Sequence, residues 1–344
     1  MRARGVDMVR TYAEAGVSGK GEMIAALVGE LRFRRRESPR MLGRIGHFTG
    51  FVGLGDRVLS MCTDGVGTKL LVAAELGKWD TVGIDCVAHN ANDMVCANVE
   101  PVAFVDYVAI DRRDDRVAAE IGKGLDRGAR LANVALIGGE IAVLPEVIRG
   151  VDLAGTCLGV ALRRDVVTGE KVRVGDVIVG VASAGIHSNG FTLARRVFRE
   201  AGLALHAALP GGRTSIGAVL LEPMRIYVRQ ALRACKAATV HGMAHITGGG
   251  VRNLARLKKG VEFAVTDPLP PQPVFTALQG LAGIADEEMY QTFNMGMGFA
   301  VVCPRRDAAA VIRAFRPFKA AVVGEVRRGR GVTVPALRLR YPGY

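Results

Sequence analysis

The sequence lacks any apolar run long enough to cross a membrane. The chain has 344 residues, of which 49% are hydrophobic and 23% are charged. Gly, Arg or Asp interrupts each apolar stretch well before the roughly 20 residues that a spanning helix requires. The basic start, MRARGVDMVR, is not followed by the apolar segment of a secretory signal. We therefore expect a globular cytoplasmic protein, long enough for two packed domains.

Cysteine pairs and abundant lysine are also missing. The six cysteines form no CxxC pair, so neither a zinc site nor a disulfide framework is indicated. Only nine of the 46 basic residues are lysine, yet the net charge is +13. Such a surplus is compatible with nucleic acid, anionic substrates or a basic solvated surface. Because the basic residues are dispersed and no zinc-finger or RNP-type motif is visible, nucleic-acid binding is the minority interpretation.

The apolar pattern predicts a mixed α+β chain in two domains. Residues 1–56 read as a Gly/Arg-rich segment with a flexible loop and one helix near 22–34. Residues 57–165 read as the first domain, with strands expected at 58–62, 101–110, 134–139 and 151–162 and a helix at Asp115–Ala132. The polar run 163–176 marks the boundary to a second domain, 166–344, with strands expected at 177–183, 261–266, 298–303 and 320–326 and a long helix at Ala218–Ala234. Strict βαβ alternation is absent, which favours α+β over a doubly wound sheet.

The segment TDGVGTK (63–69) is the first candidate for phosphate chemistry. It is not a Walker A loop, which requires GxxxxGK followed by Ser or Thr. A strand ending at Cys62 and a helix beginning at Thr68 would place backbone N–H groups where anions bind. Asp64 beside a phosphate makes sense if Mg²⁺ lies between them, because this ion takes carboxylate and phosphate oxygens together. The alternative is a turn in which Asp64 caps the helix.

Further carboxylates follow in the same half. GIDCVAHNANDMV (83–95) reads as an otherwise apolar helix, in which inward-facing polar groups are unfavourable unless paired or metal-bound. Asp93 is therefore a metal candidate, and Asp85 is interpreted as a helix cap. Glu140 follows a glycine pair at a strand end and, taken alone, reads as an exposed loop residue. Together with Asp64, these carboxylates suggest Mg²⁺–nucleotide chemistry.

Gly-rich turns recur in the second half. In ASAGIHSNGF (182–191) Ser188 and Asn189 precede a helix, which suits capture of a phosphate but also an ordinary N-cap. His187 is a candidate for acid–base chemistry or for a hydrogen bond to nearby backbone. AHITGGGVRN (244–253) and EEMYQTFNMGMGF (287–299) contribute two more such segments. Together with TDGVGTK they make four Gly-rich segments in one chain, which are hard to attribute to turns alone.

The order of these segments resembles a known family. TDGVGTK, GID with ND downstream, VEPVAFVDY, LIGGE, HSNG, LEPMRIYV, HITGGG and EMYQTFNMGMG are similar to segments of the phosphoribosylformylglycinamidine cyclo-ligases, also called aminoimidazole ribonucleotide synthetases. The resemblance runs from about Tyr12 to Val326. It implies a ferredoxin-like N-terminal domain that forms a β-barrel with a second copy in a homodimer, and a C-terminal α/β sandwich domain that binds substrate.

The resemblance also implies an activity. This is ATP-dependent ring closure of formylglycinamidine ribonucleotide to aminoimidazole ribonucleotide, with release of ADP and phosphate, in de novo purine biosynthesis. The amide oxygen is phosphorylated first, which turns a poor leaving group into a good one. The implied ATP and Mg²⁺ site comprises Asp64, Gly65, Gly67, Thr68, Lys69, Asp93, Gly138, Gly139 and Glu140, with Asp64, Asp93 and Glu140 as metal ligands. The implied substrate site comprises Ser188, Asn189, Gly190, Thr247, Gly248, Gly249 and Asn294.

Three residues take implied catalytic roles. Lys69 is expected to reach a phosphate, and His187 and His245 are candidates for polarising the amide or moving a proton, with a structural role open for one of them. The chain departs from the family pattern after the Gly-Gly-Glu segment, where residues 141–146 read IAVLPE and not TAEMPG, so that Glu146 stands in part for a lost acid. A family lysine in the flexible loop also corresponds to Arg32.

Rival enzymes of the same ATP-dependent superfamily fit the sequence less well. A selenophosphate synthetase requires a reactive Cys in its N-terminal Gly-rich segment, and residues 1–61 contain none. A formylglycinamidine synthetase is normally much longer or needs partner subunits. These absences favour the cyclo-ligase interpretation.

Overall fold

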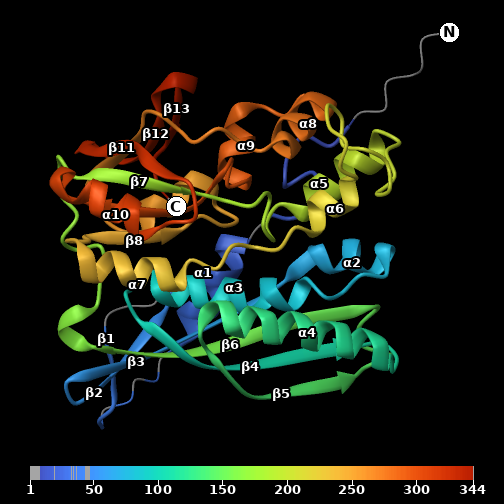
Figure 1. The fold of residues 1–344 in the computed structure, drawn as a ribbon, viewed down its shortest axis with the longest axis horizontal. Helices are drawn as coiled ribbons and strands as arrows, with labels where there is room; N and C mark the ends of the chain where they lie inside the picture. The colour runs from blue at the N-terminus through green and yellow to red at the C-terminus, as the bar shows by residue number, and fades with distance from the viewer. Residues whose placement is uncertain are drawn as a thin grey trace.

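Two β-sheets, one in each half of the chain, organise the computed structural model (Figure 1). The structure describes residues 8–18, 20–31, 33, 35, 37–42 and 47–343. Arg32 and part of the loop expected around it lie outside these ranges. Within them, no helix has both the length and the apolar character that membrane crossing requires. The mixed α+β architecture expected from the sequence is confirmed.

The first sheet has six strands in the order β1-β2-β3-β6-β4-β5, and all neighbours are antiparallel except β4 and β5. Its strands are β1 (Arg40–Leu42), β2 (Gly50–Leu54), β3 (Arg57–Gly65), β4 (Glu100–Ile110), β5 (Ala135–Val143) and β6 (Val151–Leu162). Helices α3 (Val82–Val95) and α4 (Asp115–Ala132) cover one face, and the shorter α2 (Leu70–Leu76) follows β3. From β3 onward the elements run β-α-α-β-α-β-β, whereas a ferredoxin-like unit runs β-α-β-β-α-β.

The helix α3 is buried along almost its whole length. It crosses α4 at unusually short range, because a side chain on Gly83 or Gly124 would collide with the backbone of the other helix. On its other sides α3 packs against β3, β4 and β6 and against the second half of the chain. Polar residues on α3 therefore have to find partners inside the protein.

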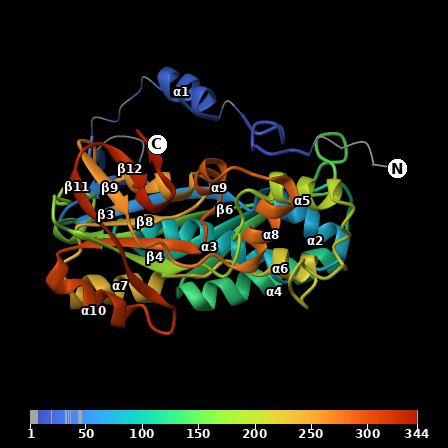
Figure 2. The same cartoon turned by 90° about the horizontal axis from the view of Figure 1, so that it is seen from above.

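The second sheet has seven strands in the order β13-β12-β9-β11-β7-β10-β8. They are β7 (Val177–Ala182), β8 (Gly242–His245), β9 (Val261–Val265), β10 (Met297–Cys303), β11 (Ala320–Arg328), β12 (Gly331–Val334) and β13 (Leu339–Tyr341). The helices of this half are α5 (Phe191–Glu200), α6 (Ile216–Leu221), α7 (Val228–Ala237), α8 (Pro273–Ala282), α9 (Asp286–Thr292) and α10 (Ala308–Ala314). Among the described strands of this sheet, β12 and β9 are the pair that runs parallel. Figure 2 shows α1 (Lys20–Glu30) beside this body and not within it.

The single helix expected at Ala218–Ala234 is wrong, because the chain turns between α6 and α7. Two side chains of α3 hold that turn. Asp85 accepts a hydrogen bond from the backbone N–H of Met224 at 2.8 Å, and Asn92 accepts one from that of Tyr227, also at 2.8 Å. Asn92 also donates to the carbonyl of Arg225 at 2.9 Å. Tertiary contacts thus override a continuous apolar pattern.

The face of the first sheet opposite α3 and α4 is apolar and open. Figure 1 shows no helix below this sheet. Leu54, Met61 and Tyr107 on that face are 49%, 59% and 41% exposed. An antiparallel sheet with one solvated face normally carries polar residues there. An exposed apolar sheet face of this kind is typical of an interaction surface.

Candidate functional site

Polar side chains of α3 meet the second half of the chain at one place. His89, Asn90 and Asn92 are buried, and Asp93 is 19% exposed in its side chain. His245, at the end of β8, lies opposite them, with its ring centre 6.3 Å from that of His89. These residues line the boundary between the two halves of the chain, and ligand sites often lie between two domains.

Asp64 lies within β3 and not in a loop after it. The strand was expected to end at Cys62, but residues 63–65 continue to pair with β6. One Asp64 oxygen accepts a hydrogen bond from the backbone N–H of Gly65 at 2.8 Å, and the other lies 3.5 Å from Nδ1 of His89. No side-chain hydrogen bond caps the helical turn that follows, so the alternative of Asp64 as a helix cap is also wrong. Its side chain is 50% exposed and is open to a ligand.

Asp93 and His245 form a close pair across the boundary. Nδ1 of the fully buried His245 lies 2.8 Å from Oδ1 of Asp93, and its Nε2 lies 3.5 Å from Nδ2 of Asn92. Because Oδ1 of Asn92 accepts from the N–H of Tyr227, Nδ2 of Asn92 faces Nε2 of His245 as a donor, and Nδ1 of His245 is the atom that donates to Asp93. His245 therefore orients the Asp93 carboxylate, and its own nitrogens are already engaged. Of the two candidate histidines, His245 is the one whose ring nitrogens both face protein groups.

Several buried polar atoms at this boundary have no hydrogen-bond partner among the described residues. They come from both halves of the chain: both ring nitrogens of His89, Oδ1 of Asn90, Nδ1 of His187, Oγ of Ser188 and Nδ2 of Asn189. Buried polar groups are nearly always paired in folded proteins. Such a concentration indicates a place where a polar ligand completes the set.

The loop 183–190 presents His187 and Ser188 in an unusual backbone conformation. His187 has φ of 66°, a left-handed value that non-glycine residues seldom adopt. Its Nε2 accepts a hydrogen bond from the backbone N–H of Ala184 at 3.0 Å, so the ring proton belongs on the unpartnered Nδ1. Burial also lowers the pKa of His187 well below its usual value. His187 is thus a neutral hydrogen-bond donor.

Asn294 braces this loop and does not face a ligand. Its Nδ2 donates to the carbonyls of Gly185 and Ile186 at 2.8 and 3.1 Å, and its Oδ1 accepts from the N–H of Gly296 at 2.9 Å. Because both ends of the amide are used, the expectation that Asn294 binds substrate is not supported. It holds the loop that carries His187 in place.

Ser188, Asn189 and Gly190 lead into α5 and lie against the second Gly-rich turn. A side chain on Gly248 would come within 2.9 Å of Oδ1 of Asn189, so these two predicted substrate segments are neighbours. Gly190 has φ of 79°, and Phe293 occupies the space that its side chain would need. Gly249 is buried beside the partly exposed Thr247–Gly248. The structure therefore brings HSNG and HITGGG together.

Lys69 does not reach toward a phosphate. Its side chain is fully buried, with Nζ 2.7 Å from Oδ2 of Asp85 and 2.7 Å from the carbonyl of Glu222. Burial lowers the pKa of Lys69 and raises that of Asp85, while their pairing opposes both shifts. The interpretation of Asp85 as a helix cap is wrong as well. The pair instead joins the first half of the chain to the turn between α6 and α7.

Glu140 points away from Asp64. Along the sheet, Asp64 is in register with Gly155, Asp106 and Gly139, and Gly155 faces Cys86 on the covered side. Glu140, one residue further, therefore lies on the open face, three strands or about 14 Å away. Within the described chain no group of three His, Cys, Asp or Glu side chains converges on one point. The three expected metal ligands are thus not assembled by one chain.

The remaining predicted nucleotide residues flank Asp64 or lie at the sheet edge. Thr68 shares a 3.0 Å hydrogen bond with the hydroxyl of Thr192 on α5. Gly65 is the last residue of β3, and Gly67 has φ of 70° at the start of the short 3₁₀ turn Gly67–Lys69. Gly138 and Gly139 belong to the edge strand β5, where Gly139 leaves room for the carboxylate of Asp106.

His89 is the residue that sequence reasoning missed. It lies between Asp64 and His245, and neither of its ring nitrogens has a hydrogen-bond partner among the described residues, although Nδ1 lies 3.5 Å from the Asp64 carboxylate. The signal was present, since Asp85, His89 and Asp93 are spaced four residues apart and share one helix face. Polar residues repeated every four positions on one face of an otherwise apolar helix indicate that this face binds a polar group.

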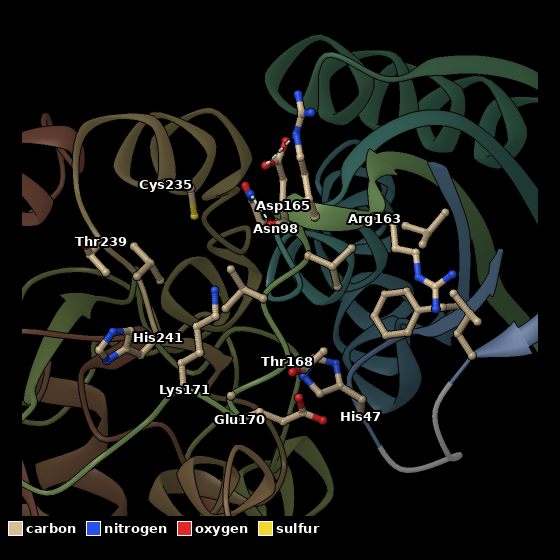
Figure 3. Close-up of a pocket in the computed structure, with 18 of the residues that line it drawn as sticks. His47, Asn98, Arg163, Asp165, Thr168, Glu170, Lys171, Cys235, Thr239 and His241 are labelled. Carbon is tan, nitrogen blue, oxygen red and sulfur yellow. Dashed lines mark hydrogen bonds and ion pairs between the residues drawn. The ribbon is translucent and has the colours of Figure 1, made fainter. Parts of the chain in front are cut away.

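A separate cavity of about 900 Å³ lies at the other end of the domain boundary (Figure 3). The linker 163–171, β2 and the end of α7 form its walls. Figure 3 shows His47, Lys171 and His241 around it, and burial lowers the pKa of His47 to about 4. None of the predicted site residues lines this cavity.

Comparisons with known proteins identify the family. The family described as AIR synthase related protein, N-terminal domain, matches residues 49–161, and AIR synthase related protein, C-terminal domain, matches residues 173–336. The phosphoribosylformylglycinamidine cyclo-ligase of Methanosarcina barkeri is 48% identical over 302 residues, covering 87% of this chain and 90% of the relative. These matches define a two-domain AIR synthase related protein. Within that class, the chain belongs to the phosphoribosylformylglycinamidine cyclo-ligase family.

Solved structures share the fold at much lower identity. The crystal structure of tt0281 from Thermus thermophilus has a TM-score of 0.64 at 22% identity, covering 94% of this chain and 98% of that one. AaThiL complexed with AMPPCP and TMP has a TM-score of 0.65 at 16% identity, covering 95% and 96%. These two likenesses establish a common architecture.

The buried ion pair gives a prediction for stability. Lys69→Met leaves Asp85 as an uncompensated charge in a fully buried position, so the free energy of unfolding should fall by about 3–5 kcal/mol. Urea denaturation measures this loss. Lys78→Met is the matched control, because the Lys78–Asp80 pair is exposed and should contribute no more than about 1 kcal/mol. If Lys69→Met is as stable as the wild type but binds ATP more weakly, Lys69 binds phosphate as the sequence predicted.

Proposed function

We propose that the protein catalyses ATP-dependent ring closure of formylglycinamidine ribonucleotide to aminoimidazole ribonucleotide. Relatives named for this reaction share nearly half of its residues over most of both chains. The observation in the structure that carries the proposal is the group of unpartnered polar atoms from both halves, with Asp64 and Asp93 beside it. A site between two halves suits a reaction that must hold two substrates at once.

The chemistry requires activation of a formamide oxygen. That oxygen attacks the γ-phosphorus of ATP, ADP leaves, the formamide nitrogen loses its proton, and an imidoyl phosphate forms. The ring-closing nitrogen then attacks the same carbon, and its C–N bond replaces the C–O bond of the departing phosphate. The ring-closing nitrogen loses its proton, and transfer of a proton from the ring CH₂ to the exocyclic nitrogen completes the aromatic ring. The formamide oxygen leaves in inorganic phosphate. In such a transfer the protein acts mainly by positioning the reactants and stabilising charge.

Each half of the chain supplies groups suited to one part of this reaction. We assign the phosphate of the ribonucleotide to Ser188 and Asn189, whose unpartnered donors precede α5. His187 offers a neutral Nδ1–H that can hydrogen-bond a substrate oxygen but cannot accept a proton at that atom. We infer that the ATP phosphates lie nearer Asp64 and Thr68. The AMPPCP complex of the similarly folded AaThiL supports a nucleoside triphosphate as the other substrate.

Asp64 and Asp93 fit a magnesium ion held jointly with phosphates. Asp64 is half exposed, and Asp93 keeps one oxygen free of His245. Mg²⁺ is usually held by one or two carboxylates together with substrate phosphates, so a three-carboxylate cage is not required. When bound, the ion would neutralise phosphate charge. His245 keeps the Asp93 carboxylate oriented, and the role of Glu140 depends on a second copy of the chain.

The open face of the first sheet supports a homodimer. We infer that two copies bury this face against each other, as the family's joined β-barrel implies. Leu54, Met61 and Tyr107 supply exposed apolar surface there, and Glu140 lies on the same face beside Tyr107. In such a dimer Glu140 would approach the partner and not the Asp64 of its own chain.

A product assay tests the proposed reaction. Purified protein is mixed with formylglycinamidine ribonucleotide, ATP and Mg²⁺, and aminoimidazole ribonucleotide and ADP are quantified. We expect the two products in equal amounts. If the protein forms ADP only when a different phosphoryl acceptor is present, and forms no aminoimidazole ribonucleotide, it has the activity of another enzyme of the superfamily.

Asp64→Asn tests the nucleotide end of the site. The amide keeps the Oδ1 that accepts the Gly65 N–H but loses the negative charge. We expect kcat to fall by at least about two orders of magnitude, as is typical when a preorganised electrostatic group is removed. Steady-state kinetics at saturating Mg²⁺ measure the change, and the exposed Asp80→Asn serves as control. Near-normal turnover would remove Asp64 from the metal site.

Met61→Asp tests the dimer. A carboxylate at this position would be desolvated in an apolar interface, so the variant should sediment as a monomer at concentrations where the wild type is dimeric. Val174 lies in the linker between the sheets, and its side chain is 52% exposed. The control variant Val174→Asp should therefore leave the sedimentation coefficient unchanged. A monomeric wild type would contradict the proposed assembly.

A further inference from the structure

His89 is buried at the boundary between the two halves and makes no hydrogen bond through its ring. The residue is 2% exposed, and neither ring nitrogen has a hydrogen-bond partner among the described residues. Protein groups, water or a ligand normally satisfy a buried polar group of this kind. None of the roles assigned to Asp64, His187 or His245 uses this ring, so its neighbours have to indicate what satisfies it.

The carboxylate of Asp64 is the charged group nearest to the His89 ring, but the two are not hydrogen-bonded. Nδ1 of His89 lies 3.5 Å from Oδ2 of Asp64, which is longer than the usual N–H···O distance of about 2.7–3.2 Å. Among the described residues, the two other pairs of a histidine with a carboxylate are hydrogen-bonded at 2.8 and 2.7 Å: His245–Asp93 and His241–Asp176. The His89–Asp64 pair therefore differs from them by its longer separation.

This separation matches two ligands of one metal ion. A divalent ion binds an imidazole nitrogen and a carboxylate oxygen at about 2.1 Å each, so the two ligand atoms lie about 3.0 Å apart at a right angle and about 3.4 Å apart at a tetrahedral angle. The 3.5 Å between Nδ1 and Oδ2 is close to the tetrahedral value. A water molecule about 2.8 Å from both atoms would need an angle of about 77° between its hydrogen bonds, which is far from tetrahedral. The geometry thus favours a cation over water between His89 and Asp64.

Other ligands of such an ion would come from the substrate side. The Asp64 side chain is 50% exposed, and its Oδ1 is held by the N–H of Gly65, which leaves Oδ2 facing His89. No third His, Cys, Asp or Glu of the described chain converges on this point. Ions that carry nucleotide phosphates usually take only one or two ligands from the protein. His89 and Asp64 are therefore sufficient if phosphate oxygens and water complete the coordination.

We propose that His89 and Asp64 are joint ligands of the ion that carries the ATP phosphates, and that the imidazole makes this site favour a first-row transition ion, such as Mn²⁺, over Mg²⁺. Mg²⁺ takes oxygen ligands, whereas transition ions also accept imidazole nitrogen. Mg²⁺ binds here through Asp64 and phosphate oxygens alone. When Nδ1 binds the ion, the ring proton is on Nε2 and can be donated to an oxygen of the ligand. The assignment rests on the proposed function, because it takes ATP as the source of the phosphates.

Pulsed electron paramagnetic resonance of Mn²⁺ tests the proposed ligand directly. Wild-type protein with Mn²⁺ and AMPPCP, an ATP analogue that is not hydrolysed, should show spin-echo modulation from a directly bound ¹⁴N nucleus. Labelling the histidines with ¹⁵N should remove this modulation, which distinguishes imidazole from adenine nitrogen. We expect His89→Gln to lose the modulation and His206→Gln, the matched control, to keep it, because His206 is exposed. A wild type without histidine coupling would overturn the proposal, whether or not the buried variant folds.

The choice of metal gives a second measurement. In His89→Gln the Kd for Mn²⁺–AMPPCP should rise about tenfold or more, since even partners of metal ligands contribute about this much to metal affinity. The Kd for Mg²⁺–AMPPCP should change by less than about twofold, because Mg²⁺ does not use the imidazole. Isothermal titration calorimetry measures both values. An equal loss for the two ions would mean that His89 only supports the local packing, and it would contradict the proposal.

Product formation distinguishes failure of this assignment from failure of the proposed function. If the wild type forms aminoimidazole ribonucleotide but its bound Mn²⁺ shows no histidine coupling, the role of His89 is wrong and the reaction stands. If the coupling is present but neither Mg²⁺ nor Mn²⁺ supports formation of the product, the proposed reaction is wrong and the metal site stands.

Discussion

The buried pair between Lys69 and Asp85 is the interaction on which the rest of the structure depends. It places an ammonium and a carboxylate in a fully dry position between the two halves of the chain. Such a pair has little net stabilising effect in itself, but losing either partner is strongly unfavourable. The carbonyl of Glu222 and the N–H of Met224 complete the hydrogen bonds of the two charges. The pair therefore fixes how the second half docks on α3.

The site follows from that docking. Once α3 is held against the turn between α6 and α7, Asp93 meets His245 and His89 lies between Asp64 and the second half. Neither half has a complete polar site of its own. The unpartnered atoms of His89 and Asn90 come from one side, and those of His187, Ser188 and Asn189 come from the other. A ligand that satisfies them would also hold the halves together.

Much of the fold could be predicted from the sequence, because local patterns set it. The helix Asp115–Ala132 and the strand at 151–162 have the expected bounds, since amphipathic period and strand alternation are local signals. The helix break after Leu221 could not be predicted, because side chains more than 130 residues away hold it. Asp64 was proposed as a metal ligand from the TDGVGTK segment, and Asp93 from its place in an otherwise apolar helix. The burial of Lys69 and the outward direction of Glu140 depend on an ion pair and on a one-residue offset in strand register, which no local pattern reveals.

The most direct test of the account follows one oxygen atom. Formylglycinamidine ribonucleotide carrying ¹⁸O in its formamide group is converted with unlabelled ATP in unlabelled water, and the inorganic phosphate is analysed by mass spectrometry. The account predicts one ¹⁸O atom in each phosphate released, because that oxygen attacks the γ-phosphorus and departs with it. Unlabelled phosphate, with ¹⁸O released to water, would show that ATP hydrolysis and ring closure are separate events and would contradict the proposed reaction.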